Sequence, residues 1–96
     1  MTEIQQFDPE TELLRCQLVE EWNAENSLQQ LTTFGVGSFG CHELFDRTFM
    51  VASMLDDFVL THPACINNPE WFALAKQSLD LLYKMYQEIG AVHLDR

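Results

Sequence analysis

The sequence is short of positive charge, of long apolar runs and of cysteine. Lysine and arginine number 5 against 15 aspartates and glutamates, which gives a formal net charge of −10. A field of this sign repels nucleic acid and anionic membranes, so we expect neither as a direct partner. Apolar runs are too short for a membrane span, which needs about 18 residues. Three cysteines without metal-like spacing predict a reducing, cytoplasmic setting.

Glycine and proline are also scarce, with 4 and 3 residues, and they are clustered. Three of the glycines fall within residues 35–40, and two of the prolines fall within 62–69. Breaks are therefore predicted at only a few positions, and no segment alternates with the period of a strand. The sequence predicts an all-α protein. Its 96 residues, 47% of them apolar, predict a single helical domain over 1–96.

The first predicted helix covers residues 9–25, after a frayed start over 1–8. Asp8 can accept hydrogen bonds from the first free amides, and Pro9 suits the first helical position. Leu14, Leu18 and Trp22 recur every four residues and predict one narrow apolar stripe. This pattern predicts a helix docked along one edge of a core. A short helical piece can begin at Leu28, and residues 32–40 are predicted to form a glycine-rich packed loop.

Two longer helices are predicted over residues 41–61 and 69–90. Pro63 ends the earlier one, Asn68 and Pro69 open the later one, and Gly90 is predicted as its left-handed cap. The short break at 62–69 makes the two helices antiparallel neighbours.

The apolar arc of the last helix is the most informative feature of the chain. It covers roughly 200°, whereas packing of two helices uses about 100° on each. The surplus can be covered by residues 26–40 folding back, or by a second copy of the chain. We therefore expect a three-helix domain built on a long antiparallel helical hairpin, which completes a bundle by dimerisation.

Residues 35–40 match the pattern G-x-G-x-x-G and precede a predicted helix. Dinucleotide binding also needs a strand before this pattern and a parallel strand after the helix. Residues 28–34 make a poor strand, and the predicted helix leads to another helix. The pattern therefore predicts a packed loop and no cofactor.

Two groups of residues invite a metal site. Cys41 and His42 begin one predicted helix, while His62 and Cys65 lie beyond its other end, some 30 Å away. One chain cannot bring all four together, so we expect small half-buried cysteines and His62 near the end of a helix.

Two acidic pairs, Glu43 with Asp46 and Asp56 with Asp57, resemble those of all-α, magnesium-dependent nucleotide hydrolases, which hold the ion between facing helices. The facing helix offers only Asp80 and Glu88, both on its polar side, and the second acidic set is missing. No nucleophile with a neighbouring base is present either. We predict no metal and no catalytic residue.

One acid and several large apolar residues stand out as candidates for function. The helix predicted over 41–61 has a broad apolar arc that we assign to the core. The residues of this arc are Leu44, Phe45, Thr48, Phe49, Val51, Ala52, Leu55, Phe58 and Val59. Asp56 falls inside this arc, where it is either a half-buried acid with a hydrogen-bonding partner or an acid at the rim that reaches water. Met50 and Met54 lie on the polar side, where methionine suits an adaptable contact. The candidate interface residues are Met50, Met54, Trp71, Leu74, Leu81 and Met85.

The leading hypothesis is a non-enzymatic helical protein that acts by self-association as a homodimer and by binding a protein partner. The net charge of −10 favours a basic partner. A second hypothesis is an inhibitor whose acidic first helix mimics nucleic acid for a nucleic-acid-binding protein, because seven acids precede Ser27. A third is a metal-dependent hydrolase. The candidate acidic surface residues are Glu10, Glu20, Glu21 and Glu25.

Overall fold

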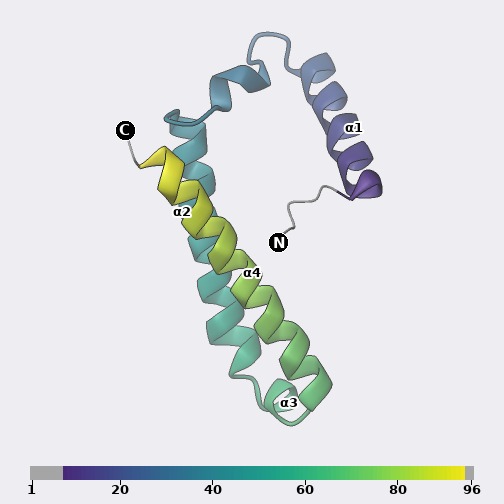
Figure 1. Cartoon of the computed structure of the whole chain (residues 1–96), viewed down its shortest axis with the longest axis vertical. Coiled ribbons are helices and arrows are strands. Elements are labelled where there is room, and N and C mark those ends of the chain that lie inside the picture. The colour runs from purple at the N-terminus through teal and green to yellow at the C-terminus, as the bar shows by residue number, and fades with distance from the viewer. Residues whose placement is uncertain (1–7, 95–96) are drawn as a thin grey trace. The chain divides into compact units, whose positions relative to one another are not determined.

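The computed structural model describes residues 8–94, and the chain divides into two compact units, Met1–Gly35 and Val36–Arg96. The predicted frayed start lies, apart from residue 8, outside the described range. Every regular element in that range is helical, which confirms the predicted all-α class (Figure 1). The single domain over 1–96 stays a prediction. The two units are described one at a time.

The first unit contains α1 (Pro9–Glu25) and the 3₁₀ helix η1 (Leu31–Phe34). The carboxylate of Asp8 accepts the amide of Thr11 at 3.1 Å, as expected of an N-cap. The indole of Trp22 donates to the carbonyl of Gln29 at 2.8 Å and meets the ring of Phe34 edge-on at 5.6 Å. These contacts fold the loop against α1. The short helical piece begins at Leu31, three residues later than predicted.

The second unit is built on α2 (Phe39–Met54) and α4 (Pro69–His93), which lie side by side (Figure 1). They are joined by the π-helical segment η2 (Leu55–Leu60) and the short helix α3 (Pro63–Ile66). Ser38 caps α2, so this helix begins two residues before the predicted Cys41. Asn68 caps α4 with two hydrogen bonds, as the sequence predicts.

The core of the second unit is small. Ala52, Leu60 and Leu79 form a buried cluster in the half of the unit nearer α3. Toward the other end, the ring of Phe45 stacks on Tyr86 with centroids 4.4 Å apart. Residues packed around the buried cluster are Leu55, Ala75, Leu82 and Tyr83.

Gly90 was predicted to end the last helix, and that prediction is wrong. The helix α4 continues through Gly90 to His93. The glycine allows close approach instead, because a Cβ added there would lie 2.8 Å from an edge carbon of Phe45. Glycine is therefore needed at position 90 for close packing of α4 on Phe45, and not as a left-handed cap.

The predicted half-burial of Asp56 is not found in the described chain, where Asp56 is exposed. The neighbouring Val59 was also placed on the core arc, because an α-helix advances 100° per residue. In the π-helical segment each turn holds more residues, so each residue advances less. This smaller advance brings Leu60 into the core in place of Val59, which remains 43% exposed.

Candidate interaction surface

The outer side of α4 carries an apolar seam with alternating spacings of three and four residues. Among its large members, Trp71 is 59% exposed, Leu74 62% and Leu81 66%. This spacing is the heptad pattern by which one helix packs along another. The α4 seam consists of Trp71, Leu74, Ser78, Leu81, Met85, Glu88 and Val92.

A second seam runs along α2 and η2. It consists of Leu44, Val51 and Phe58, which are seven residues apart and 46%, 49% and 67% exposed. The sequence placed these three on the core arc with Phe45 and Ala52. They lie at its edge instead, because one helix, α4, covers only part of so broad an arc.

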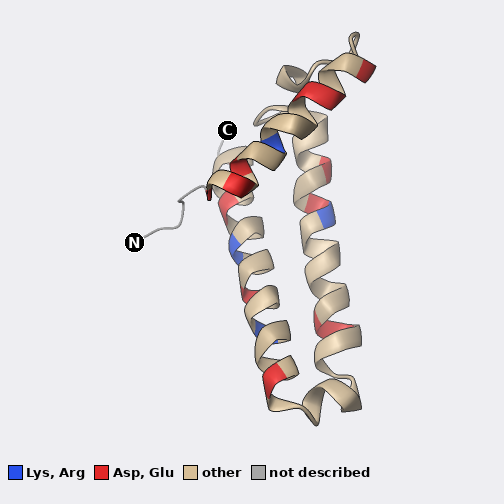
Figure 2. Ribbon diagram, turned by 90° about the vertical axis from the view of Figure 1, so that its right-hand side faces the viewer, with Lys and Arg blue, Asp and Glu red and all other residues tan. Residues whose placement is uncertain are grey.

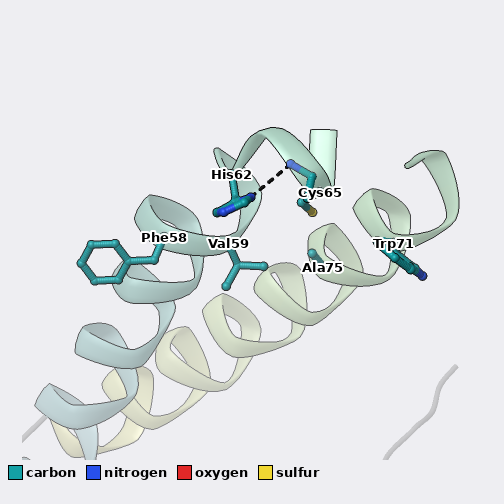
Figure 3. A pocket seen from close by; sticks show the side chains of 7 residues that line it. Phe58, Val59, His62, Cys65, Trp71 and Ala75 are labelled. Atoms are coloured by element: carbon teal, nitrogen blue, oxygen red, sulfur yellow. Dashed lines mark hydrogen bonds between the residues drawn. The ribbon is translucent and has the colours of Figure 1, made fainter. Parts of the chain in front are cut away.

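An apolar hollow of about 330 Å³ lies at the end of the unit near α3 (Figure 3). Phe58 from η2 and Trp71 from α4 both line it, so the two seams meet on the same side of this unit. We call this side, made of the α2 seam and the α4 seam, the apolar face. The remaining lining residues are Val59, His62, Ala64, Cys65 and Ala75.

His62 is the main polar side chain of the hollow. Its Nδ1 accepts the amide of Ala64 at 3.1 Å, so the neutral ring carries its proton on Nε2. The sequence placed His62 near the end of a helix, where a positive charge is favourable. His62 does follow the end of η2, where its amide donates to the carbonyl of Val59 at 3.1 Å, and it is also the N-cap of α3.

The methionines predicted as contact residues lie away from the core. Met50 is 53% exposed and Met54 is 50% exposed. Both project from the outer side of α2, roughly opposite to the buried Ala52 on the helical wheel. They are therefore separate from the α4 seam.

Charged residues alternate with uncharged stretches along both long helices (Figure 2). Arg47 pairs with Glu43 at 3.6 Å, and Lys84 pairs with Glu88 at 2.6 Å, each four residues apart. Lys76 and Asp80 make a similar pair. Exposed pairs of this kind contribute little to stability, about 0.3–0.5 kcal/mol each. They do neutralise part of the acidic surface along the two helices.

A chain of hydrogen bonds joins the start of α2 to the end of α4. The amide of Gly37, whose φ is 89°, donates to Nδ1 of His93 at 3.0 Å. The proton of this neutral ring is therefore on Nε2, which lies 3.2 Å from Nδ1 of His42. His42 in turn directs its Nε2 toward the carboxylate of Asp46 at 3.5 Å. Both nitrogens of each ring are used within this chain of contacts.

The sequence did not single out His93 because it lies 51 residues from His42, and only the pairing of α2 with α4 joins them. The glycine pattern at 35–40 supplies the amide that His93 accepts. A 3₁₀ helix precedes it where a dinucleotide site needs a strand. The pattern therefore serves as a turn and an anchor.

The four candidate metal ligands remain in two places. Cys41 and His42 lie at the start of α2, whereas His62 and Cys65 lie at the opposite end of the unit. Within residues 8–94, no three side chains of histidine, cysteine, aspartate or glutamate gather as metal ligands do.

The acidic surface candidates of the first unit, Glu10, Glu20, Glu21 and Glu25, are all exposed on α1. A hydrogen bond from Arg15 lowers the pKa of the Glu12 carboxyl below its ordinary value. Leu14 and Leu18 are 55% and 54% exposed, so α1 also presents apolar side chains between its acids.

None of the helices in the described range is both long enough and apolar enough to cross a membrane. No protein family, no curated protein and no solved structure matches the chain.

Proposed function

We propose that this protein is a non-enzymatic helical protein that self-associates as a homodimer through the apolar face. The observation that carries the proposal is the number of large apolar side chains left half-exposed on one side of a small core. Covering them removes on the order of 800 Å² per copy, which is one partner's share of a standard stable interface. The residues are Leu44, Val51, Phe58, Trp71, Leu74, Leu81, Met85 and Val92.

The core of the second unit supports the same conclusion. No large side chain within residues 8–94 is fully buried. A unit of about 60 residues buries only about 60% of the surface of its unfolded chain and is marginally stable, and oligomerisation is a common way to add buried surface. A closed dimer related by a two-fold axis is the commonest arrangement. A second copy would add its own α2 and α4 and so complete a four-helix core. This agrees with the predicted three-helix domain that completes a bundle by dimerisation.

The dimer leaves a second surface for a protein partner. Met50 and Met54 project from the outer side of α2, and flexible thioether side chains suit contacts that must adapt. The net charge of −10 favours a partner with a basic surface. Three free cysteines, two of them buried, support a reducing, cytoplasmic setting.

The proposal is tested by placing a charge in the α4 seam. Leu81 is 66% exposed within one chain, so Leu81→Glu should leave the helical fold intact. In the dimer the new carboxylate is buried without a partner, so we expect the dissociation constant to rise at least ~100-fold. Size-exclusion chromatography with light scattering measures the change in mass.

The matched control is Gln87→Glu, which adds the same charge at an exposed position away from the seam. It should leave the mass unchanged. Equal behaviour of the two variants would contradict a dimer built on the apolar face.

The acidic helix supports one alternative, inhibition by mimicry of nucleic acid. The exposure of Glu20, Glu21 and Glu25 on α1 favours it. In that case a basic partner should bind less tightly as salt rises, and changing these three residues to glutamine should abolish binding. The leading hypothesis, a non-enzymatic interaction protein, predicts the opposite result. Binding should then tolerate salt and should be lost when Met50 and Met54 are changed to aspartate.

A further inference from the structure

The spacing of the two seams points to one arrangement of the dimer. We propose that the second copy packs antiparallel, with α4 against α4 and α2 against α2, about a two-fold axis at the level of Ala52 and Leu79. This inference rests on the proposed homodimer and adds the orientation of the copies and the residues that meet. The α4 seam determines the position of the axis, and the α2 seam is compatible with it.

The α4 seam is complementary to a second α4 seam that runs antiparallel to it. In an antiparallel pair of helices, the first apolar position of each heptad packs against the second of the partner. With the axis between Leu79 and Asp80, Leu74 meets Met85 of the second copy. Ser78 then meets Leu81, and Trp71 meets Glu88. This register pairs the seam from 71 to 88 and leaves Val92 beyond the first residue of α4 in the second copy. The indole N–H of Trp71 can donate to the carboxylate of Glu88.

The α2 seam is compatible with the same axis. An axis at Val51 places Val51 against its own copy and Leu44 near η2 of the second copy. The π-helical segment displaces Phe58 from the heptad position, so the α2 seam does not fix the axis by itself.

The two axis positions coincide in the structure. Phe45 stacks on Tyr86, so these two residues lie at the same level of the unit. Because α2 and α4 run antiparallel, seven residues toward the C-terminus of α2 and seven toward the N-terminus of α4 bring Ala52 level with Leu79, and both belong to the buried cluster. Val51 therefore lies at the level of residues 79–80. A single two-fold axis satisfies both seams, which is the self-complementarity that a two-fold interface requires.

A parallel dimer is disfavoured by the only charged member of the α4 seam. Parallel packing places each seam residue against its own copy, so Glu88 would face Glu88 inside the interface. Two like carboxylates in that position repel each other and lose solvation. In the antiparallel register each Glu88 keeps its 2.6 Å pair with Lys84 and lies against an indole.

The other long antiparallel register moves the axis by half a heptad, toward Tyr83. Lys84 would then lie close to Lys84 of the second copy beside the axis, and Trp71 would extend past the end of the partner seam. Both consequences are unfavourable. The axis at Ala52 and Leu79 avoids both.

The orientation is tested by pulsed electron–electron resonance between nitroxide labels. Labels are attached to the full-length chain at Gln77→Cys or at Ala91→Cys. Both positions are exposed and lie on the same edge of the seam. Cys16 is exposed and is changed to serine so that it takes no label, whereas Cys41 and Cys65 are buried.

At a rise of 1.5 Å per residue, the antiparallel dimer separates the Ala91 labels by ~35 Å and brings the Gln77 labels within ~20 Å. A parallel dimer gives short and similar distances at both sites, and that result would overturn the orientation while leaving the homodimer standing. Long distances at both sites would mean that another surface forms the dimer. Monomer mass with no dipolar signal would instead overturn the proposed homodimer itself.

Discussion

At the scale of single residues, the close contact of Gly90 with Phe45 constrains the packing of α2 against α4. Alanine is normally better than glycine inside a helix by about 1 kcal/mol. At this position its methyl group would lie 2.8 Å from a ring carbon, and that ring is already stacked on Tyr86. Overpacking of this kind costs about 1–3 kcal/mol. Steric overlap should therefore outweigh helix propensity.

We predict that Gly90→Ala lowers the free energy of unfolding by about 1–2 kcal/mol, measured by urea denaturation at fixed protein concentration. The control is Gly35→Ala, whose added methyl group would lie 3.7 Å from the carbonyl of Thr32, an ordinary contact. Its effect should stay within about 1 kcal/mol. If Gly90→Ala were as stable as the parent protein, the Phe45 ring would be able to move aside without a loss of stability.

The residues that could be predicted from the sequence are those whose role is local. Asp8 and Asn68 act on amides two or three residues away, and both caps were predicted. Gly90 and His93 act on residues about 45 and 51 positions away, Phe45 and His42. Their roles depend on how α2 meets α4, which no local pattern reveals.

At the scale of elements, the N-cap of α4 determines where the chain turns back. The side chain of Asn68 accepts the amides of Glu70 and Trp71, both at 3.0 Å. Trp71 begins the α4 seam, so this cap also holds the first residue of the apolar face in place.

We predict that Asn68→Ala lowers the free energy of unfolding by about 1 kcal/mol, because two amides lose their acceptor. Thermal unfolding followed by circular dichroism measures the loss. Asn67→Ala serves as a comparison, since Asn67 closes α3 through its backbone amide. Equal changes at the two positions would argue against a capping role for the Asn68 side chain.

The elements differ in how well their boundaries could be predicted. Two Asx-Pro-Glu sequences predicted the starts of α1 and α4 correctly, because a cap and a proline act within one turn. The π-helical segment Leu55–Leu60 was not predicted, and it places Leu60 instead of Val59 in the core. A π-helical turn has no composition of its own, and in this chain it brings Leu60 into a cluster with Leu79.

At the scale of the whole molecule, the surplus of apolar surface was visible in the sequence, but its distribution was not. The sequence predicted Trp71, Leu74, Leu81 and Met85 as interface residues, and the structure leaves all four exposed. Leu44, Val51 and Phe58 were assigned to the core. They proved to be a second seam because one neighbouring helix covers only part of the arc of α2.

The central claim is that the apolar face is covered by a second copy, and sedimentation equilibrium of the unmodified protein tests it most directly. One chain has a mass of 11.1 kDa. At micromolar concentrations the account predicts a particle of twice that mass, which dissociates only on dilution. A mass of one chain at every concentration up to ~100 μM would contradict it, since an interface of ~800 Å² per copy should hold at that concentration.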